Sequence, residues 1–103
     1  MAGGEGMEEP ADLIAAAVLD VPGVAGLHGG TFGEVGTYLP GRRVAGVRTD
    51  ETSTDVHVTV YFDVAVADVA QRIRKVIGDL TGTKVDVTIA DVVPVPTKEL
   101  DSA

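Results

Sequence analysis

The sequence predicts a single α+β domain, a two-layer α/β sandwich in the order α-β-β-β-α-β, with two helices packed on one face of one mixed sheet. Two segments, near residues 10–20 and 67–81, repeat apolar side chains at the three- and four-residue spacing of a helix with one buried face. Two others, 55–63 and 84–93, alternate apolar and polar residues, as strands with one buried face do. A chain of 103 residues, 45% of them apolar, has room for one small core.

The first helix is expected from Pro10 to Asp20. Proline suits the first helical turn, where its missing N–H leaves no bond unmade, and Asp12 lies near the positive end of the helix dipole. The expected apolar stripe consists of Leu13, Ile14, Ala17, Val18 and Val21. Pro22-Gly23 then ends the helix.

The next segment is rich in glycine and valine and gives a weaker pattern. We expect strands near Val24–Phe32 and Arg42–Thr49. Between them, residues 33–41 have a glycine at each end and a proline at position 40, which predicts a loop.

The clearest strand follows the turn at residues 50–53. Val56, Val58, Val60 and Phe62 are expected to face the core, and Asp55, His57, Thr59, Tyr61 and Asp63 to face the other way. Strict alternation means that one face is buried and that the other meets solvent or an interface.

The second helix is expected from Ala67 to Thr81, with Asp68 in its first turn and Gly82 as its C-terminal cap. Its expected core-facing stripe is Val66, Val69, Ala70, Ile73, Val76, Ile77 and Leu80. The last strand, Lys84–Val93, points Val85, Val87 and Ile89 inward and Asp86, Thr88 and Ala90 outward. A right-handed crossover through the second helix would place this strand parallel to the one before it.

Both ends of the chain are predicted to be flexible. Residues 1–9 form an acidic, glycine-rich tail, and residues 94–103 form a second tail with two prolines and a polar end. The folded domain is therefore expected to span residues 10–93.

The charge and composition exclude several function classes. Sixteen acidic against eight basic residues give a net charge of −8, which argues against binding to nucleic acid or to anionic lipid. Three matches to GxxG, the loop by which KH domains bind nucleotide backbones, lie between Gly23 and Gly33. Such matches arise by chance in a chain with 13 glycines, and these have no basic residue beside them. With no cysteine, no apolar run of membrane-spanning length and no basic secretory leader, we expect a cytoplasmic protein without direct membrane insertion.

The residues offer little catalytic chemistry. No serine lies in a nucleophile elbow, and the two histidines, His28 and His57, form no metal-binding motif. Asp50, Glu51 and Asp55 crowd one turn, where an oxygen-ligated cation is conceivable, but a capped and solvated hairpin is favoured. We therefore assign no catalytic, cofactor-binding or metal-binding residue, and expect no cofactor.

One alternative keeps small-molecule chemistry open. His57 lies on the outer strand face with Asp55 and Tyr61 at two and four residues' distance, so these three could form an acid–base cluster or a small ligand site. A solvated polar sheet face is the favoured interpretation.

A partner surface is the preferred hypothesis. Arg72 and Lys75 share one face of the second helix, where Asp68 and Asp79 are expected to pair with them. Such a basic patch could also dock an acidic surface, such as another copy of this acidic protein. The candidate partner surface is His57, Thr59, Tyr61, Arg72 and Lys75.

Four segments between Val21 and Val93 resemble one known family. They are Val21-Pro22-Gly23-Val24 with Leu27; Val44 to Val47, leading into Val56-His57-Val58-Thr59-Val60-Tyr61; Val69-Ala70 to Ile77, ending in Leu80-Thr81-Gly82; and Val85-Asp86-Val87-Thr88-Ile89 with Asp91-Val92. In these the chain resembles the alkaline shock protein family, envelope stress response proteins of Gram-positive bacteria. The chain departs from the family where Phe62-Asp63 follows Tyr61, a position where the family often has glycine, and it lacks the long low-complexity tails of some members.

The resemblance implies a non-enzymatic cytoplasmic protein of the envelope stress response. Members of the family are recruited to the membrane by membrane-anchored relatives, and some self-associate. The resemblance therefore implies a homo-oligomer or an anchored relative as partner, and it brings no catalytic residues to carry over.

Overall fold

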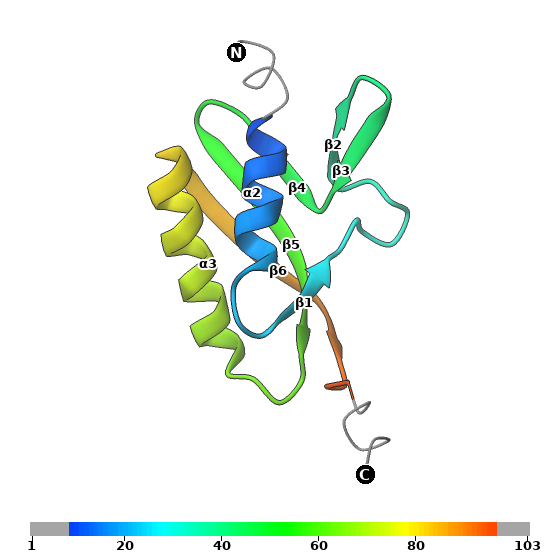
Figure 1. The fold of residues 1–103 in the computed structure, drawn as a ribbon, viewed down its shortest axis with the longest axis vertical. Helices are drawn as coiled ribbons and strands as arrows, with labels where there is room; N and C mark the ends of the chain where they lie inside the picture. Colours follow the sequence, from blue (N-terminus) through cyan, green and yellow to red (C-terminus); the bar gives the residue numbers. More distant parts are fainter. Residues whose placement is uncertain (1–8, 97–103) are drawn as a thin grey trace.

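The computed structural model describes residues 9–96, and it confirms the α+β class. Its elements are α2 (Pro10–Leu19), β1 (Val24–Leu27), β2 (Gly36–Leu39), β3 (Arg42–Ala45), β4 (Val47–Thr49), β5 (Ser53–Tyr61), α3 (Val66–Thr81) and β6 (Lys84–Val93) (Figure 1). The two helices lie side by side on one face of a mixed sheet. The tails that the sequence predicts fall mostly on residues 1–8 and 97–103, outside the described range.

Strand β5 is the centre of the sheet. β6 runs parallel to it along one edge, as the predicted crossover through α3 requires. Along the other edge β1 pairs with Val58–Val60 and β4 pairs with Thr54–Val56, both antiparallel, so β1 and β4 share one edge. His57 lies where these two strands meet: its carbonyl accepts the N–H of His28, and its N–H donates to the carbonyl of Gly46, both at 2.9 Å.

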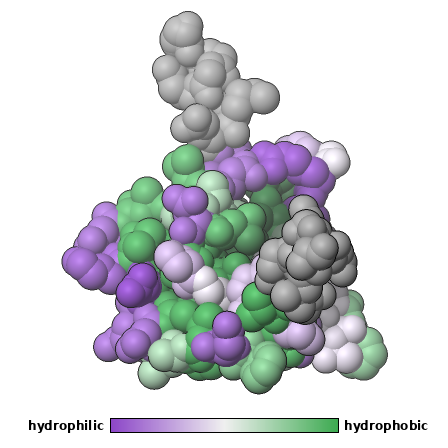
Figure 2. Space-filling view, turned by 60° about the horizontal axis from the view of Figure 1, so that its bottom comes forward, coloured by the Kyte–Doolittle hydropathy of each residue, from purple (hydrophilic) through white to green (hydrophobic). Residues whose placement is uncertain are grey.

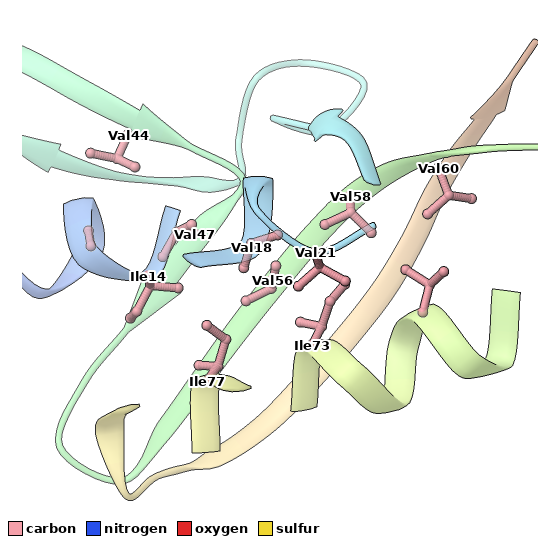
Figure 3. Close-up of a cluster of buried hydrophobic side chains, with 12 residues drawn as sticks. Ile14, Val18, Val21, Val44, Val47, Val56, Val58, Val60, Ile73 and Ile77 are labelled. Carbon is pink, nitrogen blue, oxygen red and sulfur yellow. The ribbon is translucent and has the colours of Figure 1, made fainter. Parts of the chain in front are cut away.

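The core lies between the helix layer and the inner face of the sheet (Figure 3). Its fully buried apolar side chains are Ile14, Val18, Val47, Val56, Val58, Val60, Ile73 and Ile77. Burying one such side chain stabilises the fold by about 1.5–3 kcal/mol. These contacts therefore hold both helices against the central strand.

Helix α3 buries a narrower stripe than its sequence predicts. Val69, Ala70, Ile73 and Ile77 are buried, whereas the expected core residues Val66, Val76 and Leu80 are exposed. Val66 and Leu80 lie on the same side of the helix as the buried residues but in its first and last turns, and Val76 lies at the margin of the stripe. Gly82, in the left-handed conformation at φ +72°, ends the helix and donates its N–H to the carbonyl of Gly78.

The glycine-rich region differs most from expectation. β1 ends at Leu27 instead of continuing to Phe32, and β2 lies within the segment expected to be a loop. β2 and β3 form a separate hairpin, closed at Gly41 with φ +76°. The predicted strand over 42–49 is two strands, because Gly46 adopts φ +81° and turns the chain from the hairpin into the main sheet.

Phe62 does not belong to the core face of β5. The strand ends at Tyr61, and the carbonyl of Tyr61 accepts the N–H of Val64 in the turn that leads to α3. Phe62 is 67% exposed, so the inward alternation stops at Val60.

Candidate partner surface

The face of the sheet opposite the helices has no helix over it in the described part of the chain (Figure 1). On β5 this face presents Asp55, His57, Thr59 and Tyr61, each half-buried. The neighbouring positions of β6 present Lys84, Asp86 and Thr88, which are exposed. We call these seven residues, together with Arg48 of β4, the open sheet face.

Charges of both signs lie next to one another on the open sheet face. The β-ladder places Asp55 between Arg48 of β4 and Asp86 of β6, and places His57 beside Thr88. Glu34 also lies near this face: backbone hydrogen bonds from Glu34 and Phe32 hold its pKa below the usual 4.5, with smaller contributions from the charges of His57 and Arg48. The face is therefore polar and locally balanced in charge.

Two arginines fix the loop that leads to this face. The Arg48 guanidinium donates to the carbonyl of Glu34 at 2.7 Å, and Arg43 donates to the carbonyls of Gly33 and Val35. Bonds to backbone carbonyls 8 to 14 residues away cannot be read from local sequence patterns. Local sequence patterns therefore do not predict these roles of Arg43 and Arg48.

The structure places His57, Asp55 and Tyr61 on one face, but it joins them by no hydrogen bond among the described residues. Acid–base catalysis requires such groups to reach one another or a substrate at hydrogen-bond distance. Two hollows, of about 510 and 430 Å³, lie in the helix layer, and His57 lines neither. Neither of these two hollows therefore gives the alternative a ligand site at His57.

Arg72 and Lys75 lie in the other layer. Both line the hollow of about 430 Å³ between α2 and α3, together with Ala17, Pro22 and Val76. Lys75 forms an exposed ion pair with Asp79 at 3.4 Å, as expected. The expected Asp68–Arg72 pair does not occur among the ion pairs of residues 9–96. The five candidate residues therefore form two groups, one in each layer, and not one continuous surface.

The acidic turn before β5 is a capped turn. Asp50 Oδ1 accepts the backbone N–H groups of Thr52 and Ser53 at 2.8 and 2.9 Å, and the Thr52 hydroxyl at 3.1 Å. These bonds hold the pKa of Asp50 below its usual 3.8. Within residues 9–96 no three histidine, aspartate or glutamate side chains come close enough together to hold a metal ion.

Neither α2 nor α3 is long and apolar enough to cross a bilayer. Figure 2 brings the lower end of Figure 1 forward, and there hydrophilic residues divide the hydrophobic surface. This end of the molecule therefore has a mixed surface.

Comparison of the chain with protein-family models, with curated proteins and with solved structures finds no match in any of the three.

Proposed function

We propose that this chain is a non-enzymatic interaction domain that binds a second copy of itself through the open sheet face. The observation behind the proposal is that both helices cover one face of the mixed sheet, while within residues 9–96 the other face has no helix over it. All-parallel sheets are normally covered on both faces, and β5 and β6 form a parallel pair within this mixed sheet. A partner on the open sheet face would supply the missing cover.

The charge pattern of the face suits a second copy. In a twofold dimer the same patch is used by both chains, so the patch must complement itself. Lys84 and Asp86 lie two residues apart on β6, and Arg48 lies beside Asp55, so each copy offers both signs of charge. Opposite charges facing one another across the interface would fix the register of the two sheets.

The resemblance to the alkaline shock protein family adds a biological setting to this proposal. It suggests an envelope stress role in the cytoplasm, with a membrane-anchored relative as the alternative partner for the same face. A relative with the same fold would present a similar uncovered sheet, so both partners would compete for one surface.

The first experiment captures partners from a native lysate that includes membranes. Three baits are used: the unchanged chain, Thr59→Arg on the open sheet face, and Gln71→Arg on the exposed surface of α3. Both variants add one positive charge. Thr59 lies on the outer face of β5 opposite Gly26, which has no side chain to obstruct the larger arginine. Circular dichroism and thermal unfolding check that both variants fold.

The proposal predicts that the unchanged chain and Gln71→Arg recover this protein or a membrane-anchored relative, and that Thr59→Arg recovers neither. Recovery of soluble metabolic enzymes alone would contradict the envelope stress role. Equal recovery by all three baits would contradict the open sheet face as the binding surface.

A further inference from the structure

The larger hollow, about 510 Å³, lies where α2 begins, where α3 ends and where the turn between β4 and β5 lies. Leu13 and Leu80, which the sequence places in core-facing stripes, are 42% and 47% exposed and line this hollow together with Pro10. Thr49, Asp50 and Glu51 form a polar wall. The volume of the hollow falls within the range of about 300–1,000 Å³ that is typical of small-molecule sites.

Four threonine hydroxyls, one of them from this wall, form a row of hydrogen bonds at the hollow. Thr49 bonds to the fully buried Thr54 at 2.8 Å, Thr54 bonds to Thr83 at 2.8 Å, and Thr83 bonds to Thr81 at 2.7 Å. Thr81 in turn donates to the backbone carbonyl of Ile77 at 2.8 Å. Three of the four threonines, Thr49, Thr81 and Thr83, line the hollow.

Which hydroxyl donates in each of these hydrogen bonds follows from counting protons, since a hydroxyl has only one. Thr81 donates its proton to Ile77, so Thr83 must donate to Thr81. By the same reasoning Thr54 donates to Thr83, and Thr49 donates to Thr54. Thr81 also accepts the backbone N–H of Thr83 at 3.1 Å, which fills its second lone pair.

The hollow therefore presents hydrogen-bond acceptors and no side-chain donors. Thr49 keeps two free lone pairs, while its proton is committed to Thr54. Asp50 and Glu51 add carboxylate oxygens, and among residues 9–96 no lysine, arginine or histidine lines the hollow. A ligand that bonds to this wall must bring its own protons, and a positive charge would be favoured beside two carboxylates.

We propose that this hollow binds a small molecule with a primary ammonium group and an aliphatic body. The ammonium donates to Thr49 and lies beside Asp50 and Glu51, and the aliphatic body packs against Leu13 and Leu80. This site lies in the helix layer, on the other side of the sheet from the open sheet face, so it is independent of the proposed self-association.

The test titrates the isotope-labelled full chain with n-hexylammonium and follows backbone amide shifts by NMR. Neutral n-hexanol and anionic hexanoate, which share the aliphatic body, are the matched probes. We expect saturable shifts at Leu13, Thr49 and Leu80 with a dissociation constant on the order of millimolar, as suits so small a ligand. Hexanol should bind several-fold more weakly, and hexanoate should produce no saturable shift at these residues.

Two charge-removing variants separate a specific site from general attraction to an acidic protein. Glu51→Gln removes a lining charge and should weaken hexylammonium binding by about two- to fivefold, since an exposed charge contributes little. Asp86→Asn removes the same charge from the opposite face of the sheet and should leave the affinity unchanged. Equal weakening by both variants, hexanol binding as tight as that of hexylammonium, or no saturable shift at these residues would overturn the proposal.

Discussion

Arg42 and Asp12, 30 residues apart in the chain, meet in a two-bonded ion pair with Nη1···Oδ1 at 2.7 Å and Nη2···Oδ2 at 2.6 Å. Arg42 lies on the β2–β3 hairpin and Asp12 in the first turn of α2, so the pair ties the hairpin to the helix layer. The hydrogen bonds from Arg42 hold the pKa of Asp12 below its usual 3.8.

This pair predicts a pH-dependent contribution to stability. Because the folded-state pKa of Asp12 is lowered, its contribution is fully present above the unfolded-state value of 3.8 and is lost as the pH falls through the folded-state value. The unchanged chain should therefore melt at a higher temperature than Asp12→Asn at pH 6, and the difference should shrink toward pH 3. A melting difference that stays constant over this range would show that the pair contributes nothing.

Ile73 and Arg74 are adjacent on α3 and test how the helix is oriented. Ile73 is fully buried, whereas Arg74 is exposed, and its one side-chain hydrogen bond to the described residues goes to Gln71 on its own helix, at 3.2 Å. Ile73→Ala should lower the free energy of unfolding by about 2–5 kcal/mol, because it leaves a cavity. Arg74→Ala should change it by no more than about 0.5 kcal/mol. Urea unfolding measures both, with equal m-values as the control, and the reverse ranking would refute the orientation.

Gly46 and Gly41 both have positive φ, at +81° and +76°, but differ in the space around them. A Cβ on Gly46 would lie 2.9 Å from the carbonyl oxygen of His57 and 2.9 Å from the Cβ of Leu27, while one on Gly41 would meet nothing within 4 Å. Gly41→Ala should cost about 1–2 kcal/mol, the usual penalty of the left-handed conformation. Gly46→Ala should cost distinctly more. Equal losses in thermal unfolding would mean that the approach of β1, β4 and β5 at this point is looser than described.

The sequence predicts the second half of the chain well because its patterns are long and regular. The last strand is predicted with its observed bounds, and α3 begins one residue earlier than expected. The first half is less predictable, since Gly41 and Pro40 suggest a loop whether they end a strand or close a hairpin. Phe62 continues the alternation of β5 in the sequence, yet the chain turns after Tyr61, and local periodicity does not record where a strand stops pairing.

Local patterns predict which face of its own element each candidate surface residue occupies. Alternation correctly groups His57, Thr59 and Tyr61 on the face of β5 turned away from the core. It cannot tell that Arg72 and Lys75 lie in the opposite layer, because relative placement of two elements depends on contacts distant in sequence. Local periodicity also does not predict the hollow at Leu13 and Leu80, because both residues fit core-facing stripes although they lie in the first turn of α2 and the last turn of α3, where they are exposed.

Sedimentation velocity over a series of protein concentrations tests the open sheet face most directly. The unchanged chain and Gln71→Arg should show a sedimentation coefficient that rises with concentration toward that of a dimer, and Thr59→Arg should remain a monomer at every concentration. A monomer at all concentrations for the unchanged chain, or an equal rise for Thr59→Arg, would contradict self-association through this face.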